Sequence, residues 1–440
     1  MIGPGSLLAA LIVASTPSTP EAIAWISDEP APVEPAGYEA LADGPIQPPG
    51  SPFHEEGNGQ TPDEQTPDEW MPDATMHAAC PSTPARDWLW GIYIEGWIDQ
   101  GFTVNTDSPN NRSNTPVTFN NRSNEYQFNQ VYLVLDRPVK PKQCAWDIGG
   151  RVDLLYGTDS FFASSLGLEN HLDGTAKWNS QQYGLAMPQA YVELFAPWGD
   201  GVTVRLGHFY TLLGYETVPA VDNFFYSHSY AMQYGEPFTH TGFLASLPFG
   251  DISLQAGMTR GWDTWEDNNS DMGILFGAAW TSKDELTSIA FAMHTSREQD
   301  QPPPNADTGS VFSLVVQHAF TDRLQYVVQY DHGFEPDSPV QGAEAQWYGL
   351  NQYLLYTIND DWTFGMRYEW FSDEDAARVD ANQAADYFAT TVGFNWTPTD
   401  CITVRPSFRW DWVDTPGHYP FADGTEHDQI LLDCDVIWRF

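Results

Sequence analysis

The segment Trp362-Thr-Phe-Gly-Met-Arg-Tyr-Glu-Trp-Phe371 alternates strictly between two kinds of side chain. Every second residue from Trp362 to Trp370 is aromatic or apolar, and the residues between them, through Glu369, are small or charged. Successive side chains of a β-strand point to opposite faces. The alternation therefore predicts a strand with one face in an apolar medium and the other against water or polar groups. Tryptophan stands at both ends of the apolar face, where interfacial rings lie in a membrane-spanning strand.

The same two-face alternation recurs from about residue 88 to the end of the chain. In Ile402–Asp411, an apolar set from Ile402 to Trp410 alternates with a polar set that contains two arginines. Counting such segments gives sixteen, an even number, as in bacterial single-chain barrels. The predicted strands are 89–103, 126–137, 146–156, 187–196, 202–209, 237–247, 252–260, 272–281, 286–295, 310–320, 324–332, 345–358, 362–371, 384–397, 402–411 and 428–440.

The connections between these segments alternate between short and long. The short ones are Pro197–Gly201, Pro248–Asp251, Ser282–Glu285, Thr321–Arg323, Asn359–Asp361 and Pro398–Cys401, and Arg137–Ala145 is a longer member of that set. The long ones include Val104–Asn124, Gly157–Ala186, Tyr210–Glu236, Ser296–Gly309 and Trp412–His427. Short turns on one rim and long loops on the other are typical of an outer-membrane barrel. We therefore predict an all-β fold, a transmembrane antiparallel β-barrel of about sixteen strands with a disordered N-terminal extension.

A β-propeller is the main soluble alternative, because it also has many short strands and tryptophans. A propeller would repeat every four strands, about 40–50 residues, with similarity between blades. The chain instead repeats its pattern every two strands. Its clear internal sequence repeat, Asn110-Asn-Arg-Ser-Asn114 and Asn120-Asn-Arg-Ser-Asn124, lies inside one predicted loop. The pattern favours the barrel.

Composition excludes several classes of protein. The formal net charge of −42 would repel nucleic acid and anionic membrane surfaces. The eighteen Trp, twenty Tyr and twenty-five Phe residues are too many for a disordered acidic protein. They suit a lipid-facing surface with aromatic girdles.

Residues 1–24 are predicted to be a signal peptide. Leu7–Ala14 is apolar and Ala22-Ile-Ala24 has the small residues of a cleavage site, although no Lys or Arg precedes the apolar part. An apolar tail without a role in export is the alternative. Nothing after Ala24 approaches the roughly eighteen apolar residues of a membrane-spanning helix. A chain of this kind could span a membrane only as a closed barrel.

Residues 25–85 form a separate region before the predicted barrel, which covers 86–440. The region holds twelve prolines and neither Lys nor Arg. Such a composition predicts an extended, acidic, disordered linker rather than a folded domain. A spacer, a partial pore plug and a tether to a partner all remain open as its role.

The four cysteines allow three pairings if all of them pair. Cys434 alternates with apolar neighbours and should face lipid as a small hydrophobe. Cys144 and Cys401 lie in turns on the same rim, and Cys80 precedes the first strand on that side. A disulfide from Cys80 to either turn is compatible with an oxidising periplasm.

Several motifs in the middle of the chain resemble a known family. These are Asn129-Gln-Val-Tyr-Leu133, Gly207-His-Phe209, Val218-Pro-Ala-Val-Asp-Asn-Phe-Phe-Tyr-Ser-His-Ser-Tyr230 and Gly235-Glu-Pro-Phe-Thr-His-Thr-Gly242. They are similar to the OmpL-like β-barrel porin family, which has many members in planctomycete-type bacteria, and the resemblance covers roughly residues 88–440. It implies a channel in the bacterial outer membrane and says little about the solute.

The inward-facing residues and the third long loop are the candidate site of a porin, because sixteen strands enclose an aqueous lumen. We expect Tyr210–Glu236 to fold inward and constrict that lumen, with an external loop packed on the rim as the alternative. The candidate pore-lining and constriction residues are Arg151, Asp153, Glu216, Asp222, Glu236, Arg367, Glu369, Arg405, Arg409, Asp411, Asp433, Asp435 and Arg439.

Two interpretations of these charges stay open. A basic wall opposite an acidic loop would create a transverse field that orients solutes, whereas cross-strand ion pairs would simply satisfy the polar wall. Other predicted lumen positions are mostly acidic, so we expect a weak preference for cations.

The sequence offers little for chemistry beyond transport. Glu266–Asp271 and Asp373–Asp375 carry oxygen ligands suited to Ca²⁺, but neither has the EF-hand spacing, and acidic loops are commonly just solvated. The chain has no HExxH, CxxC or GxSxG motif, and register places no Ser/His/Asp trio on one face. We therefore expect no metal site, no cofactor and no enzymatic activity.

The expected function is passive diffusion of small hydrophilic solutes through an outer-membrane porin. A solute-specific channel, or a structural or adhesive barrel with an occluded lumen, are the alternatives. The expected partners are outer-membrane lipid, small hydrophilic solutes and, through the terminal Phe440, the barrel assembly machinery, but no nucleic acid. A homotrimer is expected only by analogy with other sixteen-stranded porins.

Overall fold

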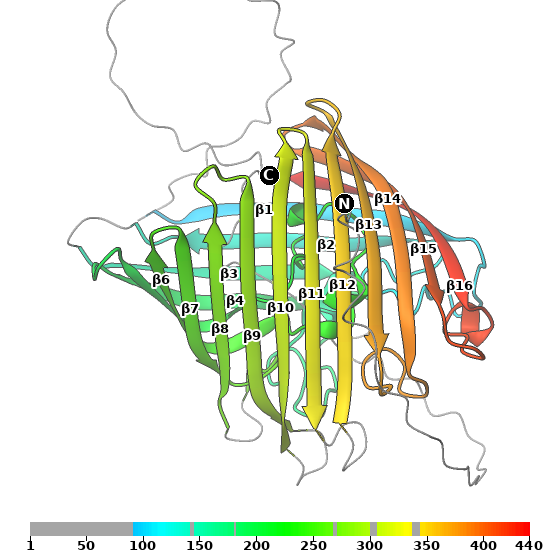
Figure 1. The fold of residues 1–440 in the computed structure, drawn as a ribbon, viewed down its shortest axis with the longest axis horizontal. Helices are drawn as coiled ribbons and strands as arrows, with labels where there is room; N and C mark the ends of the chain where they lie inside the picture. The colour runs from blue at the N-terminus through cyan, green and yellow to red at the C-terminus, as the bar shows by residue number, and fades with distance from the viewer. Residues whose placement is uncertain (1–90, 141–144, 180–181, 267–270, 300–305, 337–343) are drawn as a thin grey trace, which may run out of the picture. The chain divides into compact units, whose positions relative to one another are not determined.

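A computed structural model of the chain describes residues 91–140, 145–179, 182–266, 271–299, 306–336 and 344–440. These residues form sixteen antiparallel strands, each hydrogen-bonded to the next, and the last closes onto the first (Figure 1). The predicted barrel and its strand count are confirmed. The predicted signal peptide and the linker of residues 25–85 lie outside the described residues. The strands are β1 (Tyr93–Asn105), β2 (Glu125–Arg137), β3 (Asp147–Gly157), β4 (Gly184–Ala196), β5 (Val202–Tyr210), β6 (Thr239–Phe249), β7 (Ile252–Thr259), β8 (Gly273–Thr281), β9 (Thr287–Gln299), β10 (Ala306–Thr321), β11 (Leu324–Pro336), β12 (Glu344–Thr357), β13 (Trp362–Asp373), β14 (Ala385–Thr399), β15 (Ile402–Val413) and β16 (Asp428–Arg439).

Strand ends differ from the predicted ones by a few residues. β1 begins at Tyr93 rather than at residue 89, and β10 begins at Ala306 rather than at residue 310. The pairing of β9 with β10 continues through Ala306 and Gln299, in a segment that the sequence pattern assigned to a loop. Backbone pairing can extend past the alternating segment because the ladder does not depend on side-chain polarity.

The outer face of the barrel is apolar, as the alternation predicted. On β13 and β14, Trp362 is opposite Trp396 and Phe364 is opposite Phe394. The two tryptophan rings are stacked with centroids 5.7 Å apart. The thiol of Cys434 is free and lies on the exposed face, also as expected. Cys401 is disulfide-bonded, and the other predicted pairing candidates, Cys80 and Cys144, lie outside the described residues.

Closure of the barrel joins β1 to β16 with Gly101 opposite Asp435. The terminal Phe440 extends this ladder, because its backbone N–H donates to the oxygen of Gly96 at 2.9 Å and its oxygen accepts from the Gly96 N–H at 3.2 Å. A closed sheet leaves no unpaired edge, which is the condition for a β-structure to exist in lipid. Within the described residues, no helix is both long and apolar enough to cross a membrane.

Long loops leave one rim of the barrel and short turns leave the other. We name the long loops by the strands that they join: L1 (106–124, β1 to β2), L2 (158–183, β3 to β4), L3 (211–238, β5 to β6), L4 (260–272, β7 to β8), L7 (374–384, β13 to β14) and L8 (414–427, β15 to β16). L2 begins with the short helix η1 (Thr158–Phe161), L3 contains η2 (Ala220–Asp222) and η3 (Ala231–Gly235), and L8 contains η4 (Ala422–Gly424).

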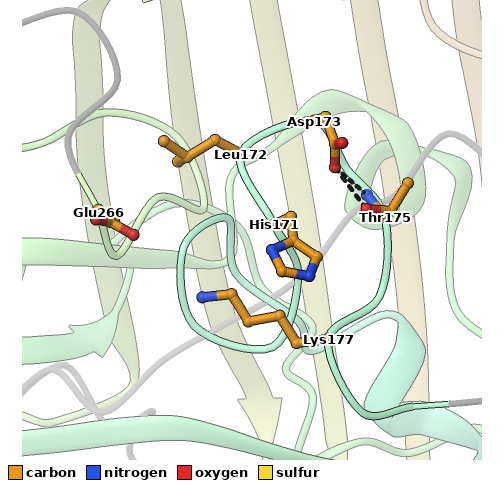
Figure 2. Close-up of a pocket in the computed structure, with 6 residues that line it drawn as sticks. All are labelled: His171, Leu172, Asp173, Thr175, Lys177 and Glu266. Carbon is orange, nitrogen blue, oxygen red and sulfur yellow. Dashed lines mark hydrogen bonds between the residues drawn. The ribbon is translucent and has the colours of Figure 1, made fainter.

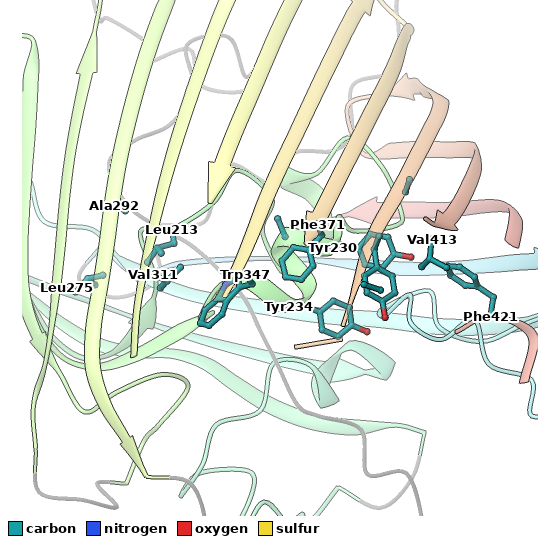
Figure 3. Packing of buried hydrophobic residues seen from close by; sticks show 14 of the residues in the cluster. Leu213, Tyr230, Tyr234, Leu275, Ala292, Val311, Trp347, Phe371, Val413 and Phe421 are labelled. Atoms are coloured by element: carbon teal, nitrogen blue, oxygen red, sulfur yellow. The ribbon is translucent and has the colours of Figure 1, made fainter. Parts of the chain in front are cut away.

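The apolar core of the protein lies inside the barrel around L3. Leu213, Tyr230 and Tyr234 of L3 belong to one buried cluster with Trp347 and Phe371 of the wall (Figure 3). A porin lumen would ordinarily hold water between its inward side chains. In this protein much of that space is therefore filled by one loop.

Candidate pore constriction

L3 lies inside the barrel and is almost entirely buried. All of residues 225–238 are buried, and Asp222 is the one exposed residue of the loop. The loop leaves β5 and crosses to the opposite wall, where the backbone N–H of Gly214 donates to Ser313 of β10 at 3.1 Å. The N–H of Tyr215 donates to Gln329 of β11 at 2.9 Å. Buried backbone groups need partners, and here the wall supplies them.

Three arginines of β13 and β15 hold L3 by its backbone carbonyl groups. Arg367 donates to the oxygen of Ser227 at 2.6 Å. Arg409 donates to the oxygen of His228 at 2.7 Å. Arg405 donates to the oxygens of Ala220 and Asn223 at 2.8 and 2.6 Å. A guanidinium group carries five N–H donors in a planar fork, so one side chain can bind the loop and still pair with acids.

The same arginines pair with carboxylates at contact distance. Arg367 lies 2.5 Å from Glu216 of L3 and 2.7 Å from Glu369 of its own strand. Arg409 lies 2.7 Å from Asp411 and 3.1 Å from Glu369, on β15 and β13. Arg405 and Asp435 of β16 are 2.6 Å apart. The loop acid thus touches the basic wall instead of facing it across water, which is the geometry of the ion-pair interpretation.

The acids of this network also bind L3 directly. Glu369 accepts the backbone N–H of Tyr230 at 2.9 Å, and Asp411 accepts the Tyr230 hydroxyl at 2.9 Å. Glu216 accepts the N–H of Ser229 at 2.6 Å. Burial raises the pKa of the Glu216 carboxyl, but the charge of Arg367 outweighs it and the net pKa is well below the usual value. Glu216 is therefore ionised at any ordinary pH.

The other predicted site residues lie apart from this network. Arg439 donates to the oxygen of Val221 in L3 at 3.1 Å. Asp433 accepts from Asn120 of L1 at 3.2 Å. Arg151 and Asp153 pair with each other on β3 at 2.7 Å. Asp222 is at the exposed tip of L3.

Glu236 forms a second buried acidic site at the end of L3. Its carboxyl accepts from Gln329, whose amide also donates to Asp331 of β11 at 2.6 Å. Burial and the neighbouring Asp331 both raise the pKa of Glu236 well above its usual value. A carboxyl group buried beside a second one is costly to ionise, so Glu236 keeps its proton to a higher pH than usual.

This site predicts a pH dependence of stability. The pKa of Glu236 is raised by folding, so the folded protein keeps this proton at pH values where the unfolded chain has lost it. The free energy of unfolding therefore falls as pH rises from 4.5, the usual pKa of the group, toward the raised pKa. We expect Glu236→Gln to abolish that fall and to be at least as stable as the parent at about pH 8. The change in stability between about pH 5 and about pH 8 is measured by heat-induced unfolding of the detergent-solubilised protein. Glu426→Gln, at an exposed position of L8, is the control, and an unchanged slope in the Glu236 variant would contradict the prediction.

L3 side chains pack against glycines on the inner wall, which the alternation pattern did not mark as site residues. A Cβ atom on Gly365 would lie 2.2 Å from the ring of Phe224, and one on Gly101 would lie 2.5 Å from the ring of Tyr226. These glycines occupy inward positions of β13 and β1, so any larger residue would push the loop away. Glycine at an inward strand position can signal such a close approach.

L1 forms a second layer on L3, a contact that no motif in the sequence indicates. The backbone N–H and hydroxyl of Thr118 donate to Gln233, and the hydroxyl of Tyr234 donates to the oxygen of Pro116. The ring of Phe119 packs on His228 with centroids 4.2 Å apart. L1, the loop that carries the Asn-Asn-Arg-Ser-Asn repeat, therefore packs over L3 instead of extending into solvent.

Where the structure describes them, the remaining candidate sites show no reactive arrangement; residues 267–270 of the stretch Glu266–Asp271 lie outside the described residues. A cavity of about 620 Å³ lies between L2 and L4, and it is lined by His171, Leu172, Asp173, Thr175, Lys177 and Glu266 (Figure 2). Across the described ranges, no group of three His, Cys, Asp or Glu side chains is placed to hold a metal ion. Asp373 accepts the backbone N–H groups of residues 377, 378 and 379 at 2.8–3.0 Å, so this acid caps the L7 turn.

Comparison with known proteins gives one family and several similar folds. The family described as "Putative beta-barrel porin-2, OmpL-like" matches residues 91–440. The outer membrane channel DcaP of Acinetobacter baumannii is 11% identical with a TM-score of 0.54, over 79% of this chain and 97% of that chain. An anion-selective porin from Comamonas acidovorans is 9% identical with a TM-score of 0.56, over 79% and 99%. OmpT of Vibrio cholerae in its trimer form is 10% identical with a TM-score of 0.52, over 79% and 99%. A search of curated proteins finds no match. At these identities, the solved structures establish similarity of fold.

Proposed function

The chain belongs to the OmpL-like β-barrel porin family and is a porin of the bacterial outer membrane, and we propose that L3 sets the aperture through which small hydrophilic solutes diffuse. One observation carries this proposal: L3 is fixed inside the lumen by Arg367, Arg405 and Arg409, each of which binds both a carboxylate and a backbone oxygen of the loop. A loop held in this way narrows the lumen permanently. The barrel would then admit solutes by size.

We also propose a weak preference for cations. Among the described residues, twelve carboxyl side chains are buried and only three arginines. A buried surplus of carboxylates creates a negative potential in the lumen or holds protons and counter-cations there. The raised pKa of Glu236 keeps a proton on that carboxyl, which removes one negative charge from the surplus, so the expected preference is small. The reversal potential in a salt gradient measures its sign, and anion preference would contradict it.

Deleting Asp222–Tyr230 tests the role of L3. This change removes the tip of the loop, the carbonyl groups that Arg367 and Arg409 bind, and one of the two that Arg405 binds. We expect a larger single-channel conductance in planar bilayers, because conductance rises with the width of the narrowest section. A deletion of the same length within the acidic region of residues 25–85 is the control. Equal conductance of the L3 deletion and the parent would refute the constriction.

The packing of L1 on L3 supports a second candidate, a barrel with an occluded lumen that serves as a structural or adhesive element. The contacts of Thr118 and Phe119 with L3 cover the loop from the outer side. Swelling of liposomes in small sugars distinguishes the two candidates, because only an open porin admits the sugar. A channel specific for one solute would show competition among solutes in the same assay.

The assembly of the barrel is a further proposal. The Vibrio cholerae protein OmpT is described in a trimer form, and we propose a homotrimer for this chain as well. Sedimentation of the detergent-solubilised protein measures its oligomeric state. The terminal Phe440, which completes the ladder between β1 and β16, is the proposed contact for the barrel assembly machinery.

A further inference from the structure

The inner wall of β3, β4 and β5 carries a patch of charged side chains that differs from the arginines under L3. Register places Arg151 of β3 opposite Tyr191 of β4, and Glu193 of β4 opposite Arg205 of β5. Arg205 bonds Glu193 at 3.0 Å and lies over the ring of Tyr191 at 4.9 Å. We call Arg151, Tyr191, Glu193 and Arg205 the β3–β5 strip. Its charged groups pair within this wall.

These side chains point into the barrel. Strand alternation places Val192 and Leu206 on the outer face, where both are 45% exposed, so their neighbours Glu193 and Arg205 face inward. An inward side chain of a closed barrel that is exposed borders space inside the barrel. Glu193 and Arg205 lie three residues from the ends of β4 and β5 at their short turn, so this space is on the short-turn side. That space is bordered by charged groups, so it holds water rather than remaining dry.

Exposure separates the strip from the loop anchors. The side chains of Arg151, Arg205 and Glu193 are 14%, 15% and 14% exposed. Those of Arg367 and Arg409 are completely buried. The arginines bound to L3 thus lie in a dry interface, whereas those of the strip retain contact with the lumen.

The tip of L3 gives a second, independent sign of water inside the barrel. Asp222 is exposed although the residues around it in L3 are buried or half-buried. Beside it, Val221 accepts a hydrogen bond from Arg439 near the end of β16. Arg439 is the last strand residue before the terminal Phe440 and lies at the short-turn rim. Water therefore reaches the loop tip from the short-turn side.

From these observations we infer that the aqueous route through the barrel follows the β3–β5 strip, and that Glu193 and Arg205 are its specificity-determining residues. This inference rests on the proposed porin function and adds the position of the route. Solutes pass along a wall that offers a guanidinium and a carboxylate side by side, with the ring of Tyr191 beside them. The arginines that stand out in the sequence, on β13 and β15, hold the loop and do not meet the solute.

Cysteine modification in planar bilayers tests the route. Arg205→Cys and Glu193→Cys are made in a Cys434→Ser background, which removes the free thiol of the lipid face. Thr391→Cys on β14 is the matched control, because this inward residue is fully buried behind L3 and bonds Arg367. The probe is the small anionic thiol reagent methanethiosulfonate ethylsulfonate. The Cys434→Ser parent without an introduced cysteine, which keeps Cys80, Cys144 and Cys401, gives the baseline.

We expect the reagent to roughly halve the conductance of the two strip variants, since it adds a charged group to the narrow route, and to leave the control unchanged. Modification of Thr391→Cys with no effect on either strip variant would overturn the inference, as would equal effects on all three. The two strip variants lie on different strands, so misfolding of one leaves the other as a test. A parent that conducts nothing would instead refute the proposed porin function.

Discussion

Replacing Arg367 with alanine is expected to lower the free energy of unfolding of the barrel by about 3–5 kcal/mol, the cost of leaving buried partner charges unpaired. Arg367 is completely buried between Glu216 of L3 and Glu369 of β13. It also donates to the oxygen and hydroxyl of Ser227. Removal of the guanidinium group leaves the Glu216 carboxylate of the loop without its partner. It also removes the hydrogen bond to the backbone oxygen of Ser227. We therefore expect a lower unfolding midpoint in urea and a larger, noisier conductance from the same variant.

A matched control separates this effect from the loss of any arginine. Arg323 is exposed in the turn between β10 and β11, so Arg323→Ala should change stability by no more than about 0.5 kcal/mol. The double variant Arg367→Met with Glu216→Gln removes a positive and a negative charge together. The double variant should be more stable than Arg367→Ala, because replacing both partners of a buried ion pair lowers the free energy of unfolding less than removing one partner. If Arg367→Ala unfolds and conducts like the parent, the arginine does not anchor L3.

The barrel itself could be predicted because its cause is visible residue by residue. Each strand has a lipid face and a lumen face, and the period-two alternation of Trp362–Phe371 records both of them. The observed pairing of β13 with β14 keeps Trp362, Phe364 and Met366 on one face, as the alternation required. Ends of strands were less predictable, since backbone pairing continues beyond the alternating segment into the loops, as in β10.

The arrangement inside the barrel could be predicted only in part. The sequence places Arg367, Arg405 and Arg409 on the inner wall, and all three lie there. It cannot show that their main partners on L3 are backbone oxygens, because every residue has one and none is marked in the sequence. The interpretation therefore stayed open between a transverse field and ion pairs, and the contact distances now favour the pairs.

Two other features could not be predicted from the sequence, for physical reasons. The raised pKa of Glu236, a residue of L3, depends on burial and on Asp331, which is distant in the chain and lies on β11. The docking of L1 on L3 depends on shape, with Phe119 against His228. The inward glycines Gly101 and Gly365 were a usable signal, since glycine weakens a strand unless something must approach its backbone closely.

Placing an arginine at Leu432 is expected to lower the free energy of unfolding in a lipid bilayer by about 2–4 kcal/mol, the cost of a charge on the lipid face of a barrel near the midplane. Leu432 lies near the middle of β16 and is 46% exposed. Its partners across the two neighbouring strands are Phe408 and Val104, so its surroundings are apolar on both sides. Because both partners are apolar, an arginine there must reach toward the headgroups to stay hydrated.

The same residue type in water provides the comparison. Tyr419 is 50% exposed in L8, on the long-loop rim, so Tyr419→Arg should change stability by no more than about 0.5 kcal/mol. Urea unfolding of both variants in the same vesicles measures the difference between them. The contrast depends on hydrocarbon against the outer face, since an arginine in water at Leu432 would cost as little as one at Tyr419. Equal stability of the two variants would show that this face is not in the membrane.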